Sequence, residues 1–253
     1  MDPAVSKAAL KLPRLLPSLF TRDPLSRAVR ALSQAAREKR AQMFRDAFEF
    51  TEATRVLDLG SEIGRNIHAV LAGTPVKLAN VYICDIRQPL LEIGAQRYGF
   101  VPVLAKEGAP LPFDDGFFDV VYCSSVIEHV TVPKQEIWST RSERRFVERA
   151  AERQAQFAAE IRRLGRQYFV QTPNIHFPVE SHSWLPFVGW LPRPLLLSVL
   201  SVTNRVWVKS TEPDWRLLDR DDMAALFPDA EIVGERCLGL TKSLIAVKRA
   251  QRA

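Results

Sequence analysis

The chain has 253 residues, of which 47% are hydrophobic and 25% are charged. These proportions are typical of a folded globular protein and exclude collagen-like, low-complexity and wholly disordered chains. The formal net charge is +6, and residues 1–49 alone hold ten basic against five acidic side chains, so that 10 − 5 = +5. The sequence favours a solvated basic helix face as the reason, while an anionic partner such as nucleic acid or a membrane surface stays the alternative.

The predicted elements alternate between strands and helices. Apolar runs predict strands over 55–59, 80–85, 101–105, 118–123, 167–172, 230–237 and 243–247. Helical spacing predicts helices over 25–50, 64–71, 89–98 and 141–166, and a further helix that Asp219 or Asp221 caps. This alternation predicts an α/β fold with five parallel strands covered on both faces. Residues 238–242 are too few for a parallel crossover, so the last two strands should pair antiparallel.

The cysteines and the apolar segments indicate the cellular compartment in which the protein is expected. Cys84, Cys123 and Cys237 are widely spaced and form no CxxC pair, which favours a reducing, intracellular compartment over a disulfide framework. Pro13 and Pro17 interrupt any secretory signal, and the sequence holds no run of 18 uncharged apolar residues. We therefore expect a cytoplasmic protein.

A strand–turn–helix unit at residues 56–64, with the sequence VLDLGSEIG, is the first candidate binding site. Glycines at the carboxyl end of a parallel strand let a ligand approach the backbone. The pattern is not the GxGxxG of dinucleotide enzymes, because Asp58 lies two residues before Gly60 and would repel a pyrophosphate. A carboxylate there suits a cationic ligand that also carries an amine and a carboxylate. S-adenosylmethionine has these groups.

Four motifs in this order resemble class I S-adenosylmethionine-dependent methyltransferases, especially the type 11 small-molecule branch. They are DLGSEIG at 58–64, Asp85 at the end of the second strand, EGAPLPF at 107–113 with FDVV at 118–121, and CSSVIEHV at 123–130. The resemblance covers residues 52–175, and the last strand pair is similar as well. It implies a Rossmann-like, seven-stranded methyltransferase domain over residues 51–253, a helical N-terminal extension over 1–50 and a lid insertion at about 176–216.

The resemblance also implies which residues hold S-adenosylmethionine. Asp85 would grip the ribose hydroxyls and Glu107 would lie near the adenine amine. The full expected set is Asp58, Gly60, Gly64, Asp85, Glu107 and Ser124. Two residues depart from the family pattern, since Glu62 replaces the usual middle glycine and Glu107 is one methylene longer than the usual Asp. These departures leave open an alternative, a non-catalytic interaction protein that retains the methyltransferase fold.

Three histidines are candidates for the chemistry of the methyl acceptor. His129 follows the fourth strand, and His176 and His182 follow the fifth. A histidine can accept the proton that a hydroxyl nucleophile must lose. Methyl transfer to oxygen is the expected reaction, and nitrogen and carbon acceptors stay open as alternatives. Local packing is the alternative role for each of them. With Glu180, His176 and His182 could also ligate a metal, but they lack the acidic pair that Mg²⁺ prefers, so the sequence predicts no metal.

Residues 184–208 are rich in apolar side chains and lie where the family builds its substrate lid. Three prolines and Arg193 argue against a membrane-spanning helix. The segment is expected either to pack on its own core or to contact a bilayer or a lipid-like acceptor, together with Lys7, Lys11 and Arg14. A nucleic-acid acceptor is disfavoured, because no Asn/Asp-Pro-Pro-Tyr run follows the fourth strand. The sequence thus predicts methyl transfer to a small or lipophilic acceptor with S-adenosylmethionine as cofactor.

Overall fold

A computed structural model describes residues 24–207 and 209–250. The chain divides between Arg37 and Glu38 into two compact units. Helix α1 (Pro24–Ala47) begins in the first unit, and its last turns belong to the second. The helical extension expected over residues 1–50 and the lid insertion expected at about 176–216 stay predictions. Lys7, Lys11 and Arg14, which were expected at a membrane surface, lie outside the described residues.

In the larger unit, the described residues form one mixed sheet of seven strands in the order β3-β2-β1-β4-β5-β7-β6. The strands are β1 (Val56–Leu59), β2 (Val81–Asp85), β3 (Val101–Leu104), β4 (Phe118–Ser124), β5 (Gly165–Pro173), β6 (Glu231–Cys237) and β7 (Leu240–Lys248). Strands β1 to β5 run parallel, whereas β7 pairs antiparallel with both β5 and β6. The predicted fold class, with five parallel strands and an antiparallel terminal pair, is confirmed.

Five of the described helices agree with the sequence pattern, and one, α5 (Arg193–Val206), was not predicted. The helices are α1, α2 (Arg65–Val70), α3 (Gln88–Tyr98), α4 (Glu143–Leu164), α5 and α6 (Arg220–Leu226). The Asp219 side chain caps α6 by accepting a hydrogen bond from the backbone of Asp222, which settles the choice between Asp219 and Asp221. Helix α5 was not predicted, because prolines flank its start and its apolar residues gave no clear period.

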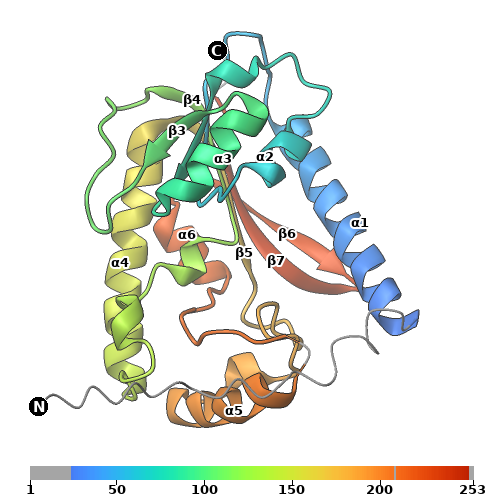
Figure 1. Ribbon diagram of the computed structural model, residues 1–253, viewed down its shortest axis with the longest axis vertical. Coiled ribbons are helices and arrows are strands. Elements are labelled where there is room, and N and C mark those ends of the chain that lie inside the picture. Colours follow the sequence, from blue (N-terminus) through green and yellow to red (C-terminus); the bar gives the residue numbers. More distant parts are fainter. Residues whose placement is uncertain (1–23, 208, 251–253) are drawn as a thin grey trace, which may run out of the picture. The chain divides into compact units, whose positions relative to one another are not determined.

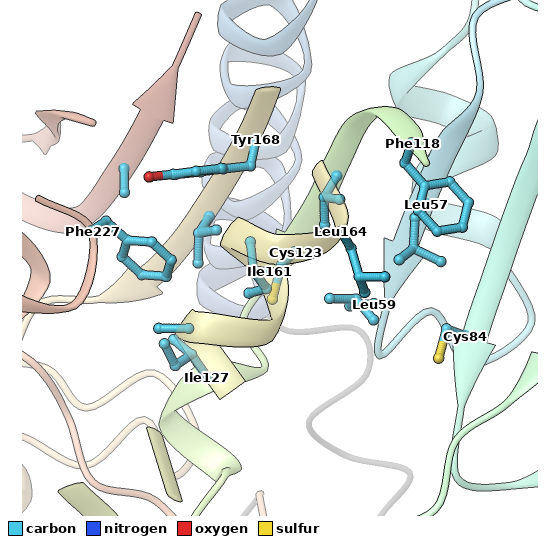
Figure 2. Close-up of a cluster of buried hydrophobic side chains, with 14 of the residues drawn as sticks. Leu57, Leu59, Cys84, Phe118, Cys123, Ile127, Ile161, Leu164, Tyr168 and Phe227 are labelled. Atoms are coloured by element: carbon cyan, nitrogen blue, oxygen red, sulfur yellow. The ribbon is translucent and has the colours of Figure 1, made fainter. Parts of the chain in front are cut away.

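Two hydrophobic clusters cover the two faces of the sheet. Leu57 and Leu59 of β1 point toward α4 and α6, where they join a cluster that includes Ile161, Leu164 and Phe227 (Figure 2). The opposite face packs against α2, α3 and the last turns of α1, through Ile67, Leu91 and Phe44 among others. Since side chains alternate along a strand, Val56 and Asp58 lie on this second face.

The residues between β5 and α6, called the lid segment below after the lid expected at about 176–216, have a small core of their own. Its buried members are Val188, Leu196, Leu200, Trp215 and Leu217. Figure 1 shows α5 at the bottom of the view, below the β5 strand and apart from α2 and α3. None of the described helices has both the length and the apolar character needed to cross a bilayer.

Candidate functional site

The turn after β1 depends on two glycines. Gly60 has a φ of +72° and Gly64 a φ of +74°, values that side chains disfavour. A Cβ at Gly60 would lie 2.4 Å from Val126 Cγ2, and one at Gly64 would lie 2.7 Å from the Phe100 ring. The Gly60 N–H donates to the Cys84 carbonyl at 2.8 Å, which joins the turn to the end of β2. The predicted glycines therefore allow a close approach of backbone and side chains at this edge of the sheet.

Asp58 offers a carboxylate oxygen that is ready for a ligand. The residue is buried, and among the described residues nothing donates a hydrogen bond to its Oδ2. Burial, followed by the negative charge of Asp85, raises the pKa of Asp58 well above its usual range. A buried carboxyl oxygen without a donor is costly, and a cationic group beside it would relieve both the missing hydrogen bond and the desolvation. The ammonium group of S-adenosylmethionine fits this position.

Asp85 lies at the end of β2, as predicted, but its carboxylate is already engaged. Oδ1 accepts hydrogen bonds from the backbone N–H and from Nε of Arg87, both at 3.0 Å. Oδ2 accepts from the Glu62 N–H at 3.0 Å and from Arg87 Nη2 at 3.3 Å. Burial alone would raise the pKa of Asp85, but the hydrogen bonds and charge of Arg87 outweigh it and lower that pKa. A ribose would thus have to displace the Arg87 side chain.

Glu62 keeps the backbone conformation of the glycine that it replaces. Its φ is +53°, in the left-handed region that favours glycine. Its N–H donates to Asp85, and its carboxylate lies 3.3 Å from Arg87 Nη2. Glu62 therefore extends the contact between Arg87 and Asp85.

The other two expected cofactor residues have partners of their own. The Ser124 hydroxyl donates to Gln171 Oε1 at 2.7 Å and accepts from Arg40 Nη1 at 3.3 Å. Its only donor is thereby used within the protein. Glu107 is half-exposed and lies 3.7 Å from Arg153 of α4.

Two of the three predicted histidines meet beside the same edge of the sheet. The rings of His129 and His182 lie 4.5 Å apart, edge to face. His129 ends the 3-10 turn η3 (Ile127–His129) that follows β4, and its Nδ1 lies 3.0 Å from Asp214 Oδ1. His182 comes from the lid segment and stacks on Trp215. The core and the lid thus each contribute one imidazole.

His182 lies between two carboxylates. Its Nδ1 is 2.6 Å from Glu180 Oε1, and its Nε2 is 3.5 Å from Glu128 Oε1. Burial would lower the pKa of His182, but the two carboxylates outweigh burial and raise it to about 9. Burial likewise works to raise the pKa of Glu180, whereas the hydrogen bonds and charge of His182 bring it down to about 2. At neutral pH His182 and Glu180 therefore form an ion pair.

His176 is not part of this group. It lines a separate cavity of about 190 Å³ with Asn174, Asp219, Arg220, Asp221, Thr241 and Leu244. The structure therefore brings His129 and His182 together and leaves His176 elsewhere.

Several site residues were not predicted. Arg87 lies two residues after Asp85 and could have been noticed by that spacing. Asp214 is 85 residues from His129 in the sequence. It lies between α5 and α6, where the sequence shows no helix or strand periodicity. Glu128 was seen only as part of the Glu-His motif, since its burial cannot be read from the sequence.

Comparisons with known proteins agree with this geometry. Residues 57–141 match the type 11 family model, whose description is "Methyltransferase domain". A search of curated protein sequences found no match. Among solved structures, one from Nostoc punctiforme PCC 73102, described as a candidate O-methyltransferase, is 12% identical with a TM-score of 0.51. The alignment covers 86% of this chain and 56% of that one. PigF, solved with SAH, is 16% identical with a TM-score of 0.50, and the alignment covers 86% and 64% of the two chains.

The fold and the matched segment define a class I methyltransferase. The predicted resemblance is confirmed over residues 57–141, which match the type 11 methyltransferase domain and support S-adenosylmethionine-dependent methyl transfer. S-adenosylmethionine is the cofactor of this protein. The orphaned Asp58 oxygen and the Gly60 turn fit that cofactor, whereas Asp85 fits it once Arg87 moves aside.

Proposed function

We propose that this protein transfers the methyl group of S-adenosylmethionine to an oxygen atom of a small or lipophilic acceptor. The observation that carries the proposal is the pairing of His129 with Asp214 at 3.0 Å, beside the Gly60 turn. Val126, which packs against Gly60, lies three residues before His129. The cluster that surrounds His129 is therefore close in the chain to the expected position of the cofactor.

An oxygen acceptor explains why these groups gather there. A hydroxyl must lose its proton when it attacks the methyl carbon, whereas a neutral amine can attack with its lone pair first. When His129 Nδ1 donates to Asp214, its Nε2 is left as the unprotonated atom that faces away from that carboxylate. Displacement at the methyl carbon otherwise requires alignment and the exclusion of water. The lid segment contributes both, because it supplies Asp214 and covers the turn that carries His129.

The lid favours an acceptor with apolar surface. Its inner side is the cluster around Leu196 and Trp215. Its outer side exposes further apolar residues: Trp184, Phe187, Trp190, Leu195, Val202, Val206 and Trp207. This exposed surface supports peripheral contact with a membrane from which a lipophilic acceptor could be taken. Arg193 does not belong to that surface, because it is 2% exposed.

The test uses S-adenosylmethionine with a labelled methyl group and acceptor panels of phenols, carboxylic acids and amines. We expect label in the oxygen acceptors, and a drop of roughly 100-fold in kcat for His129→Ala, as is usual for loss of a proton acceptor. The His176→Ala variant is the matched control and should retain activity. Label in the amines alone, or full activity of His129→Ala, would refute an oxygen acceptor.

A further inference from the structure

We propose that Glu128, His129 and His182 form a binding site for one divalent transition-metal ion. Each of these side chains has one ligand atom, and the three atoms lie within 4.8 Å of one another. Two donors that share a zinc ion, each about 2.1 Å from it, are at most about 4.2 Å apart. The site therefore closes around an ion with a side-chain shift of about 1 Å.

Both histidines are oriented as metal ligands are. The Nδ1 of His129 is 3.0 Å from Asp214 Oδ1, and the Nδ1 of His182 is 2.6 Å from Glu180 Oε1. A carboxylate on Nδ1 orients the ring with Nε2 toward the site, which is the usual outer-sphere arrangement of metal-binding histidines. In His182 a metal ion would replace the proton that Nε2 carries at neutral pH. Asp214 holds the His129 ring and Glu180 holds the His182 ring. These two carboxylates come from different parts of the lid segment, so each ring is oriented independently of the other.

Glu128 supplies the third ligand, and one of its buried carboxylate oxygens has no hydrogen-bond donor in the part of the chain that the structure describes. The residue is 0% exposed, and its Oε2 accepts a hydrogen bond from the Thr172 hydroxyl at 3.0 Å. Among the described residues nothing donates a hydrogen bond to Oε1, whose ion-pair partner is His182 Nε2 at 3.5 Å. In the metal-free protein the His182 imidazolium is the cation that faces this buried oxygen, and a metal ion that replaces the Nε2 proton would compensate the carboxylate at shorter range. The orphaned oxygen faces the atom of His182 that a metal would bind.

The donor set selects the kind of metal. Two imidazole nitrogens and one carboxylate oxygen suit Zn²⁺, Mn²⁺, Fe²⁺ or Co²⁺, and they leave coordination positions open for a ligand. Mg²⁺ and Ca²⁺ prefer oxygen donors. The sequence predicted no metal because an acidic pair was missing, but that criterion applies to Mg²⁺ and not to a site that is rich in nitrogen.

The metal site would connect the core to the lid. Glu128 and His129 follow β4, whereas His182 belongs to the segment between β5 and α5. An ion that binds all three should therefore stabilise the lid against local opening. Its open positions would accept an oxygen of the methyl acceptor, and the ion would then promote loss of the hydroxyl proton in place of His129, whose Nε2 would be a ligand. This last step rests on the proposed function, while the site itself does not.

The experiment measures metal binding directly. The full-length protein is stripped with EDTA and titrated by calorimetry with ZnCl₂, MnCl₂ and CoCl₂ in separate runs. We expect one ion per chain for at least one metal, visible d–d absorption with Co²⁺, and slower proteolytic cleavage of the lid when the ion is bound. Glu128→Gln and His182→Gln should each weaken binding by about 100-fold, and Asp214→Asn by about 10-fold.

His176→Gln is the matched control, since it changes another histidine outside the cluster, and circular dichroism verifies that every variant is folded. The proposal is overturned if none of the three metals binds, or if binding survives in Glu128→Gln and Asp214→Asn as it does in the control. Absence of binding would leave methyl transfer to oxygen untouched. Binding with only amine products would refute the oxygen acceptor and leave the metal site standing.

Discussion

Arg87 occupies both carboxylate oxygens of Asp85, the residue that is expected to bind the cofactor ribose. The guanidinium donates to Oδ1 at 3.0 Å and to Oδ2 at 3.3 Å, and the Arg87 N–H adds a third bond. With the Glu62 N–H, the carboxylate has used about all the lone pairs it can offer. Since the Arg87 side chain is 48% exposed, it can move into solvent when the cofactor arrives. Cofactor binding therefore competes with an internal cation.

The first prediction concerns this competition. Asp85→Ala should weaken S-adenosylmethionine binding by about 2–3 kcal/mol, because hydrogen bonds to a charged acceptor are worth about 1.5–3 kcal/mol each and are not additive. Arg87→Met should act in the opposite direction and tighten binding by up to about fivefold, since a half-exposed ion pair contributes about 0–1 kcal/mol. Isothermal titration calorimetry measures both. Weaker binding by Arg87→Met would mean that the guanidinium contacts the cofactor.

The second prediction concerns the left-handed residue Glu62. Replacing it with glycine should relieve about 1–2 kcal/mol of backbone strain and restore about 0.4–1 kcal/mol of chain entropy to the unfolded state. The net gain in the free energy of unfolding should be about 0.5–1 kcal/mol in urea, with cofactor affinity unchanged or improved. A sharp loss of affinity would show instead that Glu62 holds the methionine ammonium.

The third prediction concerns Arg193, which anchors α5. Its side chain donates to the carbonyls of Thr140 at 2.6 Å, Pro213 at 3.1 Å and Ile137 at 2.5 Å, and it lies 3.5 Å above the Phe146 ring. Burial lowers the pKa of Arg193 to about 10, so the group stays charged at neutral pH. Arg193→Met should cost about 3–5 kcal/mol, because it leaves two buried carbonyls and one part-buried carbonyl without this donor.

Urea unfolding measures that loss, and limited proteolysis shows whether the lid opens first. Arg205→Met on the same helix is the control, since Arg205 is exposed, and it should change stability by less than about 0.5 kcal/mol. Equal effects of the two substitutions would contradict an anchoring role for Arg193.

The fourth prediction is a pH dependence. Arg87 lowers the pKa of Asp85 below its unfolded value, so the pair stabilises the fold above the unfolded pKa of about 3.9. That contribution is lost as the pH falls through the lower, folded value. Thermal unfolding from about pH 6 to about pH 3 should therefore show a shallower loss of stability in Arg87→Met than in the wild type. Parallel curves would mean that the pair contributes nothing measurable to folding.

The fifth prediction concerns membrane contact of the lid. Val202 and Val206 of α5 are 62% and 81% exposed. Changing both to serine should reduce co-sedimentation with vesicles of mixed anionic and neutral phospholipids, and added salt should weaken binding if the basic N-terminal residues take part. Leu238→Ser is the control, because Leu238 is 91% exposed in the turn between β6 and β7, outside residues 176–216. A wild-type protein that stays in the supernatant at low salt would exclude this contact.

The sequence predicted the sheet well because its signals are local. Each strand is a short apolar run that ends near a turn residue, and residues 238–242 alone decide that the last two strands pair antiparallel. The same holds for the glycine turn, since Gly60 and Gly64 have positive φ values that few other residues adopt. The motifs also placed Asp58 in the first strand and Asp85 at the end of the second, and the structure adds that these two strands pair in parallel.

The contacts that set the state of the site could not be predicted, because they join residues far apart in the chain. Asp214 reaches His129 over 85 positions, and Glu128 meets His182 only after the lid has folded back. The carboxylate of Asp85 and the hydroxyl of Ser124 were expected to face a cofactor. Arg87 already binds the carboxylate, and Gln171 already binds the hydroxyl. Competition between side chains for the same partner produces no recognisable periodicity or composition in the sequence. The metal-ligand group was missed for the same reason.

The position of β7 has a consequence for synthesis. Among the described strands this one comes last in sequence order, yet it lies inside the sheet, between β5 and β6. While the ribosome makes the chain, β1 to β5 emerge first, and the outer edge of β5 keeps its backbone N–H and C=O groups unpaired until residues 240–248 follow. Unpaired strand edges attract other chains. A nascent molecule therefore passes through a stage in which the unpaired edge of β5 makes the partly formed sheet prone to aggregation. A chain that stalls before residues 240–248 would remain at that stage.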